Sequence, residues 1–289
     1  MLSTDANVVA LSAPLVEADF DPALNALWIS MTIQRSRPQN FSNKLLQALQ
    51  GLINHVCENQ GLWGNEEGGD PIHYAVLRSR HPNYFNLGGD LNYFLDCIRR
   101  GDPDSLRNYS MQCLDMIYQW ATAITRQSTT IALVQGRALG GGFETALSAD
   151  YIVAEEHAEF GFPEILFGLF PCTGGMSLLA RRIGVYEAEK IMRNGKIYSA
   201  IELEEIGIID RVCPSGTGES AIGEFIIEHS KRRKARQALQ HAKARMTALN
   251  YEELNSVVND WVAAAMCLTD NELRVLETLV KMQRSEFAH

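Results

Sequence analysis

Residues 134–175 constrain this 289-residue chain most strongly, because they combine glycine turns and apolar segments with two spaced glutamates. Three consecutive glycines, 140–142, come just before Glu144, and an apolar segment and a Gly-Phe-Pro turn come before Glu164. Glycine turns can leave backbone N–H groups open to a ligand. Two carboxylates beside such amides predict proton transfer next to a carbonyl group.

The composition is typical of a globular protein with a large core and an acidic surface. Hydrophobic residues make up 46% of the chain, and 35 acidic against 26 basic residues give a formal net charge of −9. This balance argues against a general nucleic-acid binder or a protein bound to an anionic membrane. The six cysteines have no CxxC spacing, which predicts neither a zinc site nor a disulfide framework.

The sequence shows no targeting or membrane segment. The N-terminus lacks a basic region followed by a long apolar run, and no later segment reaches the roughly 20 apolar residues of a membrane span. The expected compartment is therefore the cytoplasm.

The first part of the chain alternates strand and helix patterns. Residues 24–33 and 72–77 are predicted strands, separated by a helix with Ser42 as its N-cap and by a glycine-rich loop at 61–71. A glycine pair, Gly88-Gly89, follows the second strand and can leave an amide open to a ligand. An ordinary turn is the alternative.

The middle of the chain continues this alternation. A long helical region is expected from residue 91 to about 125, then a buried strand at 129–135, a short helix at 143–148 and a buried strand at 151–154. Each glutamate also has a simpler reading: Glu144 could only face a helix dipole, and Glu164 could be a solvated turn residue.

In order and spacing, these motifs resemble the crotonase, or enoyl-CoA hydratase/isomerase, superfamily. The resemblance is carried by Gly88-Gly89-Asp90, QGRALGGGFE, YIVAEE and PEILFGLFPCTGG. It implies an α/β fold, a spiral of repeated ββα units with a helical C-terminal region, assembled as a homotrimer or a dimer of trimers. The predicted organisation is an N-terminal extension at 1–20, a core at 21–215, and a helical region at 216–289 that serves oligomerisation and covers the acyl pocket.

The resemblance also implies a divided active site. Its oxyanion hole would be the backbone N–H groups of Gly89 and Gly141, and its acid and base would be Glu144 and Glu164. The physical chemistry agrees, since a carboxylate removes a proton beside a thioester only if the enolate oxygen is stabilised, at about 3 kcal/mol for each donor. No metal or separate cofactor is expected. Further substrate contacts are predicted at Leu87, Gly88, Gly140, Met176 and Trp261.

Within the superfamily, the chain looks most like the bacterial diffusible signal factor synthases. That resemblance implies dehydration of a 3-hydroxyacyl chain on acyl carrier protein to a cis-2-enoyl chain, followed by thioester hydrolysis to a free fatty acid signal. An ordinary enoyl-CoA hydratase is the alternative. The second alternative is a binding scaffold with little turnover that contacts a sensor kinase or a carrier protein.

One departure from the common hydratase pattern favours the carrier protein weakly. No lysine follows Asp90, which predicts weaker recognition of the CoA nucleotide. Candidate contacts for an acidic carrier are the basic segment 231–245 and four arginines, although a solvated surface role is simpler for each. These arginines are Arg78, Arg80, Arg99 and Arg100.

The C-terminal part is predicted to be mostly helical. Ser199 and Glu202 form a capping-box pattern, a short strand is expected at 208–212, and amphipathic helices are expected at 251–268 and 271–282. Three side chains there could cap an acyl tunnel, with core packing as the alternative. They are Met246, Trp261 and Met266.

Overall fold

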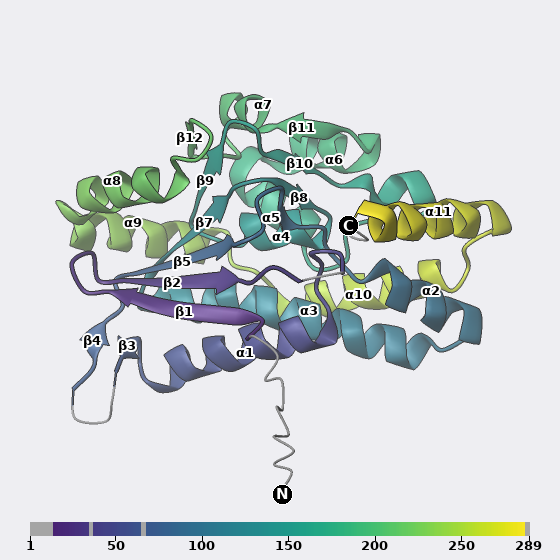
Figure 1. Cartoon of the computed structure of the whole chain (residues 1–289), viewed down its shortest axis with the longest axis horizontal. Coiled ribbons are helices and arrows are strands. Elements are labelled where there is room, and N and C mark those ends of the chain that lie inside the picture. Colours follow the sequence, from purple (N-terminus) through teal and green to yellow (C-terminus); the bar gives the residue numbers. More distant parts are fainter. Residues whose placement is uncertain (1–13, 35–36, 65–67, 287–289) are drawn as a thin grey trace, which may run out of the picture.

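The computed structural model describes residues 14–34, 37–64 and 68–286 (Figure 1). Residues 1–13 of the predicted N-terminal extension and residues 65–67 of the predicted 61–71 loop lie outside the described residues. The first strand begins at Val16, so the main sheet starts within the range predicted as the extension.

A six-stranded sheet forms the centre of the molecule. Its strands lie in the order β1-β2-β5-β7-β9-β12, with β1 antiparallel to β2 and the other neighbours parallel. Every residue of β5 and β7 is buried, as expected for apolar strands covered on both faces. The bounds are β1 (Val16–Asp21), β2 (Ala26–Met31), β5 (Tyr74–Ser79), β7 (Thr129–Val134), β9 (Tyr151–Glu155) and β12 (Arg211–Cys213).

A second sheet of four short strands, in the order β11-β10-β8-β6, gives the fold its repeat. After each of β5, β7 and β9 the chain enters this sheet and then a helix, which makes three ββ-helix units. The predicted spiral of ββα units is confirmed. The bounds are β6 (Tyr84–Asn86), β8 (Arg137–Leu139), β10 (Glu159–Gly161) and β11 (Ile197–Ser199); β3 (Leu62–Trp63) and β4 (Asp70–Pro71) pair separately.

Two predicted helix starts are confirmed by their caps. Ser42 Oγ accepts the Leu45 N–H at the start of α1 (Asn43–Glu58). The capping box of Ser199 and Glu202 opens α7 (Ala200–Glu205). The remaining short elements of the core are η1 (Ile124–Arg126), α4 (Gly141–Leu147), η2 (Pro163–Phe167), α5 (Gly175–Ile183) and α6 (Val185–Asn194).

The predicted helical region over 91–125 is confirmed, but it is divided into separate helices. The structure has α2 (Leu91–Arg100) and α3 (Pro103–Thr122), followed by η1. Gly101 ends α2 in a left-handed conformation with φ 64°, and Asp102 caps α3 by accepting the Ser105 N–H at 3.0 Å. The Gly-Asp-Pro sequence carries stop, cap and start signals that outweigh the apolar periodicity.

The C-terminal helices pack onto the core and do not form a separate layer. Trp261, Val258 and Leu276 belong to the same apolar cluster as the sheet and the first helices. Figure 1 shows α11 beside α2, and α10 packs against α3. The bounds are α8 (Gly218–Ser230), α9 (Arg233–Met246), α10 (Tyr251–Ala265) and α11 (Asp270–Glu286). Among the described residues, no helix is long and apolar enough to cross a membrane.

Two side-chain predictions are corrected by burial. Arg78 was expected on the surface, but it is 5% exposed; its guanidinium lies over Trp28, donates to Ser30 Oγ and pairs with Glu219. Met246 was a candidate to cap an acyl tunnel, with core packing as the alternative, but it is 82% exposed on α9 and does neither. The packing of helices α8 and α9 sets the exposure of both side chains, and the local sequence does not specify that packing.

Candidate active site

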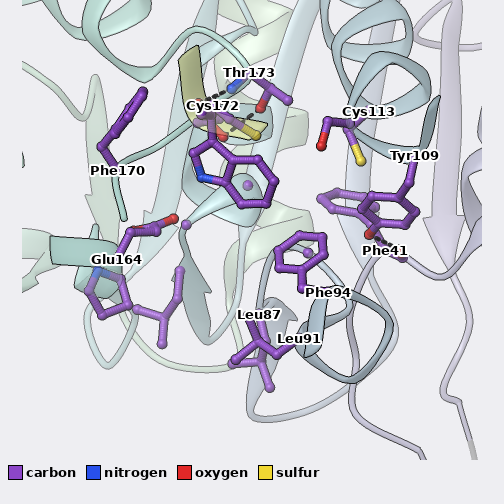
Figure 2. A pocket seen from close by; sticks show the side chains of 18 of the residues that line it. Phe41, Leu87, Leu91, Phe94, Tyr109, Cys113, Glu164, Phe170, Cys172 and Thr173 are labelled. Carbon is purple, nitrogen blue, oxygen red and sulfur yellow. Dashed lines mark hydrogen bonds between the residues drawn. The ribbon is translucent and has the colours of Figure 1, made fainter. Parts of the chain in front are cut away.

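An apolar cavity of about 180 Å³ lies where the ββα units meet the C-terminal helices (Figure 2). Both predicted glutamates and both predicted oxyanion glycines line it. Figure 2 shows Glu164 on one side and Tyr109 and Cys113 on the other, with Phe94 between them. Residues that line this cavity include Leu87, Leu91, Gly89, Gly140, Gly141, Glu144, Phe170, Cys172, Thr173, Trp261, Leu279 and Gln283.

The first glycine turn follows β6. Gly88 has φ +85°, and a Cβ atom there would lie 2.8 Å from both Gly141 N and Leu139 O. A side chain would therefore force the two glycine loops apart. Three amides beside Gly89 donate hydrogen bonds: Leu87 N–H to Gln39 O (2.8 Å), Gly88 N–H to Asn86 Oδ1 (2.8 Å) and Asp90 N–H to Tyr109 Oη (3.0 Å).

The second glycine turn opens α4. Gly140 has φ 52° and precedes the first helical residue, Gly141, whose N–H has no acceptor within the helix. A Cβ atom on Gly141 would lie 3.7 Å from Gly89 N, so the two loops are adjacent. Across residues 14–34, 37–64 and 68–286, neither the Gly89 nor the Gly141 N–H donates to a protein acceptor. Both glycines line the cavity.

Glu144 is buried in the first turn of α4 and is fully hydrogen-bonded. Its Oε1 accepts the Thr173 and Gly175 N–H groups, each at 2.8 Å, and its Oε2 accepts the Thr173 hydroxyl at 2.5 Å. Gly175 is the first residue of α5, so the carboxylate also faces the positive end of that helix. Burial raises the pKa of Glu144, while these three donors act to lower it. The donors favour the ionised form.

Glu164 has the opposite environment. It lies at the start of η2 and reaches the cavity, where its Oε2 atom is buried without a hydrogen-bond partner among the described residues. Burial, followed by the nearby charge of Glu144, raises the pKa of Glu164 to about 8. Glu164 therefore keeps its proton to a higher pH than a free carboxyl group, whereas the three donors around Glu144 favour its ionised form. The two carboxyl groups thus have unequal environments.

Aromatic side chains form the wall behind the first glycine turn. Trp261 of α10 is 2% exposed, and its ring meets the Phe94 ring edge-on with centroids 5.0 Å apart. Phe94 in turn packs against Gly89. Cys113 and Cys172 also line the cavity, and burial raises the pKa of both thiols, to about 12 for Cys113. This wall suits an acyl chain and contains no charged nucleophile.

The predicted substrate contacts fall in different places. Leu87, Gly140 and Trp261 line the cavity, and Gly88 supports it through its contact with Gly141. Met176 is 37% exposed at the start of α5 and is not among the residues that line the cavity. Met266 does not line it either.

Sequence reasoning missed Thr173, Tyr109, and the α11 residues Leu279 and Gln283, all of which line the cavity. Tyr109 lies within the helical region predicted at 91–125, and nothing in the sequence connects its hydroxyl with Asp90, 19 residues away. The signal for Thr173 was its position directly before the Gly-Gly pair that opens α5. Within the described residues, no three His, Cys, Asp or Glu side chains are grouped so that they could hold a metal ion.

A ββα spiral that places two amides without a protein acceptor and two carboxyl groups around one apolar cavity defines the class of fold and site. The comparison of sequences identifies the family. It matches the family described as enoyl-CoA hydratase/isomerase over residues 64–266, and the chain belongs to that family.

Individual relatives are similar over part of their length. The mitochondrial enoyl-CoA hydratase of Pongo abelii is 34% identical over 208 residues, which cover 69% of this chain and 64% of the relative. A probable enoyl-CoA hydratase of Mycobacterium tuberculosis is 31% identical over 169 residues, 58% of this chain and 62% of the relative. The matched part thus spans less than two thirds of these relatives.

The fold has clear counterparts among solved structures. An enoyl-CoA hydratase from Bacillus halodurans superposes with a TM-score of 0.73, covering 91% of this chain and 99% of that one. The identity is 23%, so this likeness supports the fold alone.

Proposed function

We propose that this protein catalyses the reversible addition of water across the C2–C3 double bond of an acyl-CoA thioester. The observation that carries the proposal is the unequal hydrogen bonding of two buried carboxyl groups beside two free amides. The relatives named as enoyl-CoA hydratases support it. Enolate chemistry with both an acid and a base suits hydration better than a simple double-bond shift.

The reaction follows from the positions of these groups. The thioester oxygen accepts hydrogen bonds from Gly89 and Gly141 N–H. Ionised Glu144 takes a proton from a water molecule while the water oxygen attacks C3. The C2–C3 π electrons move toward the thioester carbonyl, and an enolate forms. Protonated Glu164 then delivers its proton to C2. In the reverse direction Glu164 removes the C2 proton and Glu144 protonates the leaving hydroxyl.

A second candidate is the signal-synthase reaction on acyl carrier protein. It is favoured by the absence of Lys and Arg from the described residues that line the cavity, where Leu91 and Phe94 follow Asp90. Here water would be removed from a 3-hydroxyacyl chain to give the cis-2-enoyl thioester. A second water would then add to the carbonyl carbon, the oxyanion would use the same amides, and the C–S bond would break to release the thiol and the free acid.

The carrier protein of this second candidate would need a basic docking surface. The segment 231–245 contains Lys and Arg but no Asp or Glu, on a chain with a formal net charge of −9. Of its cations, Arg236 pairs with Glu228 at 3.9 Å. Charge complementarity with an acidic carrier supports this segment as the docking surface.

The two candidates are separated by mass spectrometry of products from one purified protein. The substrates are trans-2-enoyl-CoA, 3-hydroxyacyl-CoA and 3-hydroxyacyl-[acyl carrier protein], each over several chain lengths. Reversible interconversion of the CoA thioesters without free acid supports the hydratase, whereas free cis-2-enoic acid supports the synthase. No turnover of any substrate would contradict both.

The catalytic glutamates are tested in the same assay. Glu144→Gln and Glu164→Gln should each lower kcat by about 10²-fold or more, since each removes a proton-transfer group. Both variants should remain folded. If the double variant kept wild-type turnover, these residues could not be the acid and the base.

A further inference from the structure

The Gly88–Gly89 peptide group is held in one orientation by Phe41. The Phe41 N–H donates to Gly88 O at 2.9 Å, and the two strand-like segments form a parallel bridge. A trans peptide group is planar, so its C=O and N–H point in opposite directions. The bond to Gly88 O therefore directs the Gly89 N–H away from Phe41. Gly89 itself lines the cavity.

Tyr109 connects both sides of this arrangement. Its hydroxyl, projected from α3, donates to Phe41 O and accepts the Asp90 N–H at 3.0 Å. Phe41 thus holds the peptide group through its N–H and is itself held through its C=O. Tyr109 is 1% exposed, and its ring packs edge-on against Phe94 with centroids 5.4 Å apart.

The second oxyanion amide needs no such connection. Gly140 O accepts the Glu144 N–H at 3.0 Å, so the regular hydrogen bonding of α4 orients the Gly140–Gly141 peptide group. Gly89 lies in a loop without a helix to orient it. The Tyr109 hydroxyl, which comes from α3, bonds to two residues: Phe41, which binds Gly88 O, and Asp90, which follows Gly89.

We propose that Tyr109 is a positioning residue, whose hydroxyl directs the Gly89 N–H at the thioester oxygen. This inference rests on the proposed enolate chemistry. It adds a residue of α3 that touches no reacting atom and acts through the loop. Without the hydroxyl, Phe41 O and Asp90 N–H lose a shared partner and the Gly89 peptide group can rotate.

The first test compares Tyr109→Phe with the matched variant Tyr93→Phe. Tyr93 is a neighbouring tyrosine whose hydroxyl donates to Ser105 O at 3.5 Å, away from the glycine loop. Complete loss of an oxyanion donor lowers kcat by about 10²–10³-fold, so a misdirected donor should lower it by about 10–100-fold. KM should change little in Tyr109→Phe, and Tyr93→Phe should resemble the wild type. Equal kcat in all three proteins would overturn the proposal.

The second test measures carbonyl polarisation directly. Hexanoyl-CoA labelled with ¹³C at the carbonyl is bound to each protein, and its C=O stretch is recorded by infrared difference spectroscopy. We expect a shift to lower frequency in the wild type and in Tyr93→Phe, and a smaller shift in Tyr109→Phe at saturating ligand. An equal shift in Tyr109→Phe would overturn the role of Tyr109. No shift in the wild type would instead contradict the proposed function.

A third measurement does not depend on the variant folding. In the wild type, the Asp90 amide should exchange slowly with solvent, because the buried Tyr109 hydroxyl accepts it. Nuclear magnetic resonance with ¹⁵N-labelled aspartate measures this exchange rate. Rapid exchange of the Asp90 amide in the folded protein would show that the connection is not maintained and would overturn the proposal.

Discussion

Two carboxyl groups of the same chemical type have different hydrogen-bond environments in one cavity. Thr173 supplies two of the three donors to Glu144, one from its backbone and one from its hydroxyl. Glu164 has no partner for its buried Oε2 within the described part of the chain. The donors around Glu144 favour its ionised form, and Glu164 Oε2 has no such donor.

Replacing Thr173 by Val should raise the pKa of Glu144, because it removes the hydroxyl donor and keeps the side-chain shape. A hydrogen bond to a charged group contributes about 1.5–3 kcal/mol, which corresponds to an upward shift of about 1–2 pH units in the acid limb of kcat/KM for hydration. Thr173→Ser keeps the hydroxyl and should follow the wild-type profile. Identical pH profiles for Val and wild type would contradict this role.

Glu164 should make the protein less stable as pH rises. Its pKa is about 8 in the folded protein against 4.5 for the free group, so the folded state binds more protons between these values. Stability should therefore fall as pH increases from about 4.5 to about 8. Thermal unfolding of Glu164→Gln should lack this part of the decline, whereas the exposed control Glu205→Gln should keep it. The same slope in both variants would refute the assignment.

The break between α2 and α3 allows residues of both helices to line the cavity. α2 contributes Leu91 and Phe94, and α3 contributes Tyr109 and Cys113. A single straight helix over the same residues would carry the second group away from the first at about 1.5 Å per residue. The turn at Gly101 and Asp102 therefore helps to close the cavity.

Two glycines in helical regions should respond in opposite directions to alanine. Gly101 has φ 64°, so Gly101→Ala should lower the free energy of unfolding by about 1–2 kcal/mol. Gly51 lies inside α1 with open space around its Cα, so Gly51→Ala should raise it by about 0.5–1 kcal/mol. Urea unfolding measures both. Equal effects would show that backbone conformation does not decide the difference.

For the whole molecule, the C-terminal helices complete the site that the ββα units begin. Trp261 of α10 and Leu279 of α11 line the cavity, and Leu276 of α11 lies in the main apolar cluster. Arg99 of α2 pairs with Glu277 of α11 near this contact. The site thus depends on residues that lie more than 100 positions apart in the sequence.

The predicted self-association stays a prediction, and large apolar side chains at the surface offer a place to test it. Large exposed apolar side chains lie on η2, α6, β11 and α7, and Leu166 belongs to the same short helix as Glu164. Exposed apolar side chains in such numbers favour a protein interface. They are Ile165, Leu166, Val185, Tyr186, Ile197, Ile201 and Ile206.

We expect a homotrimer or a dimer of trimers, held partly by this surface. Leu166→Glu places a charge in the interface and should lower the mass measured by analytical ultracentrifugation. The matched control is Leu239→Glu on α9, where Leu239 is 72% exposed and lies outside this surface. A monomeric wild type, or a Leu166→Glu variant with unchanged mass, would contradict the prediction.

The sequence by itself determined the parts of the protein that depend on neighbouring residues. Apolar runs predicted the buried strands, Ser42 and the capping box at Ser199 predicted helix starts, and ordered glycine and glutamate motifs predicted the fold class. The same motifs selected Gly89, Gly141, Glu144 and Glu164 as candidate site residues. Local conformational preferences and short-range hydrogen bonds are sufficient for the strands and helix starts, whereas the fold class and the site residues followed from the resemblance to the crotonase superfamily.

Only the tertiary structure decided how those residues differ and what surrounds them. It turned Arg78 inward, left Met176 outside the cavity, and brought Tyr109 to a loop that it contacts through one hydroxyl. It also gave Glu144 the donors of Thr173 and left Glu164 Oε2 without a hydrogen-bond partner in the described chain. Burial and hydrogen-bond geometry set these properties, because they arise from contacts between segments that are distant in sequence.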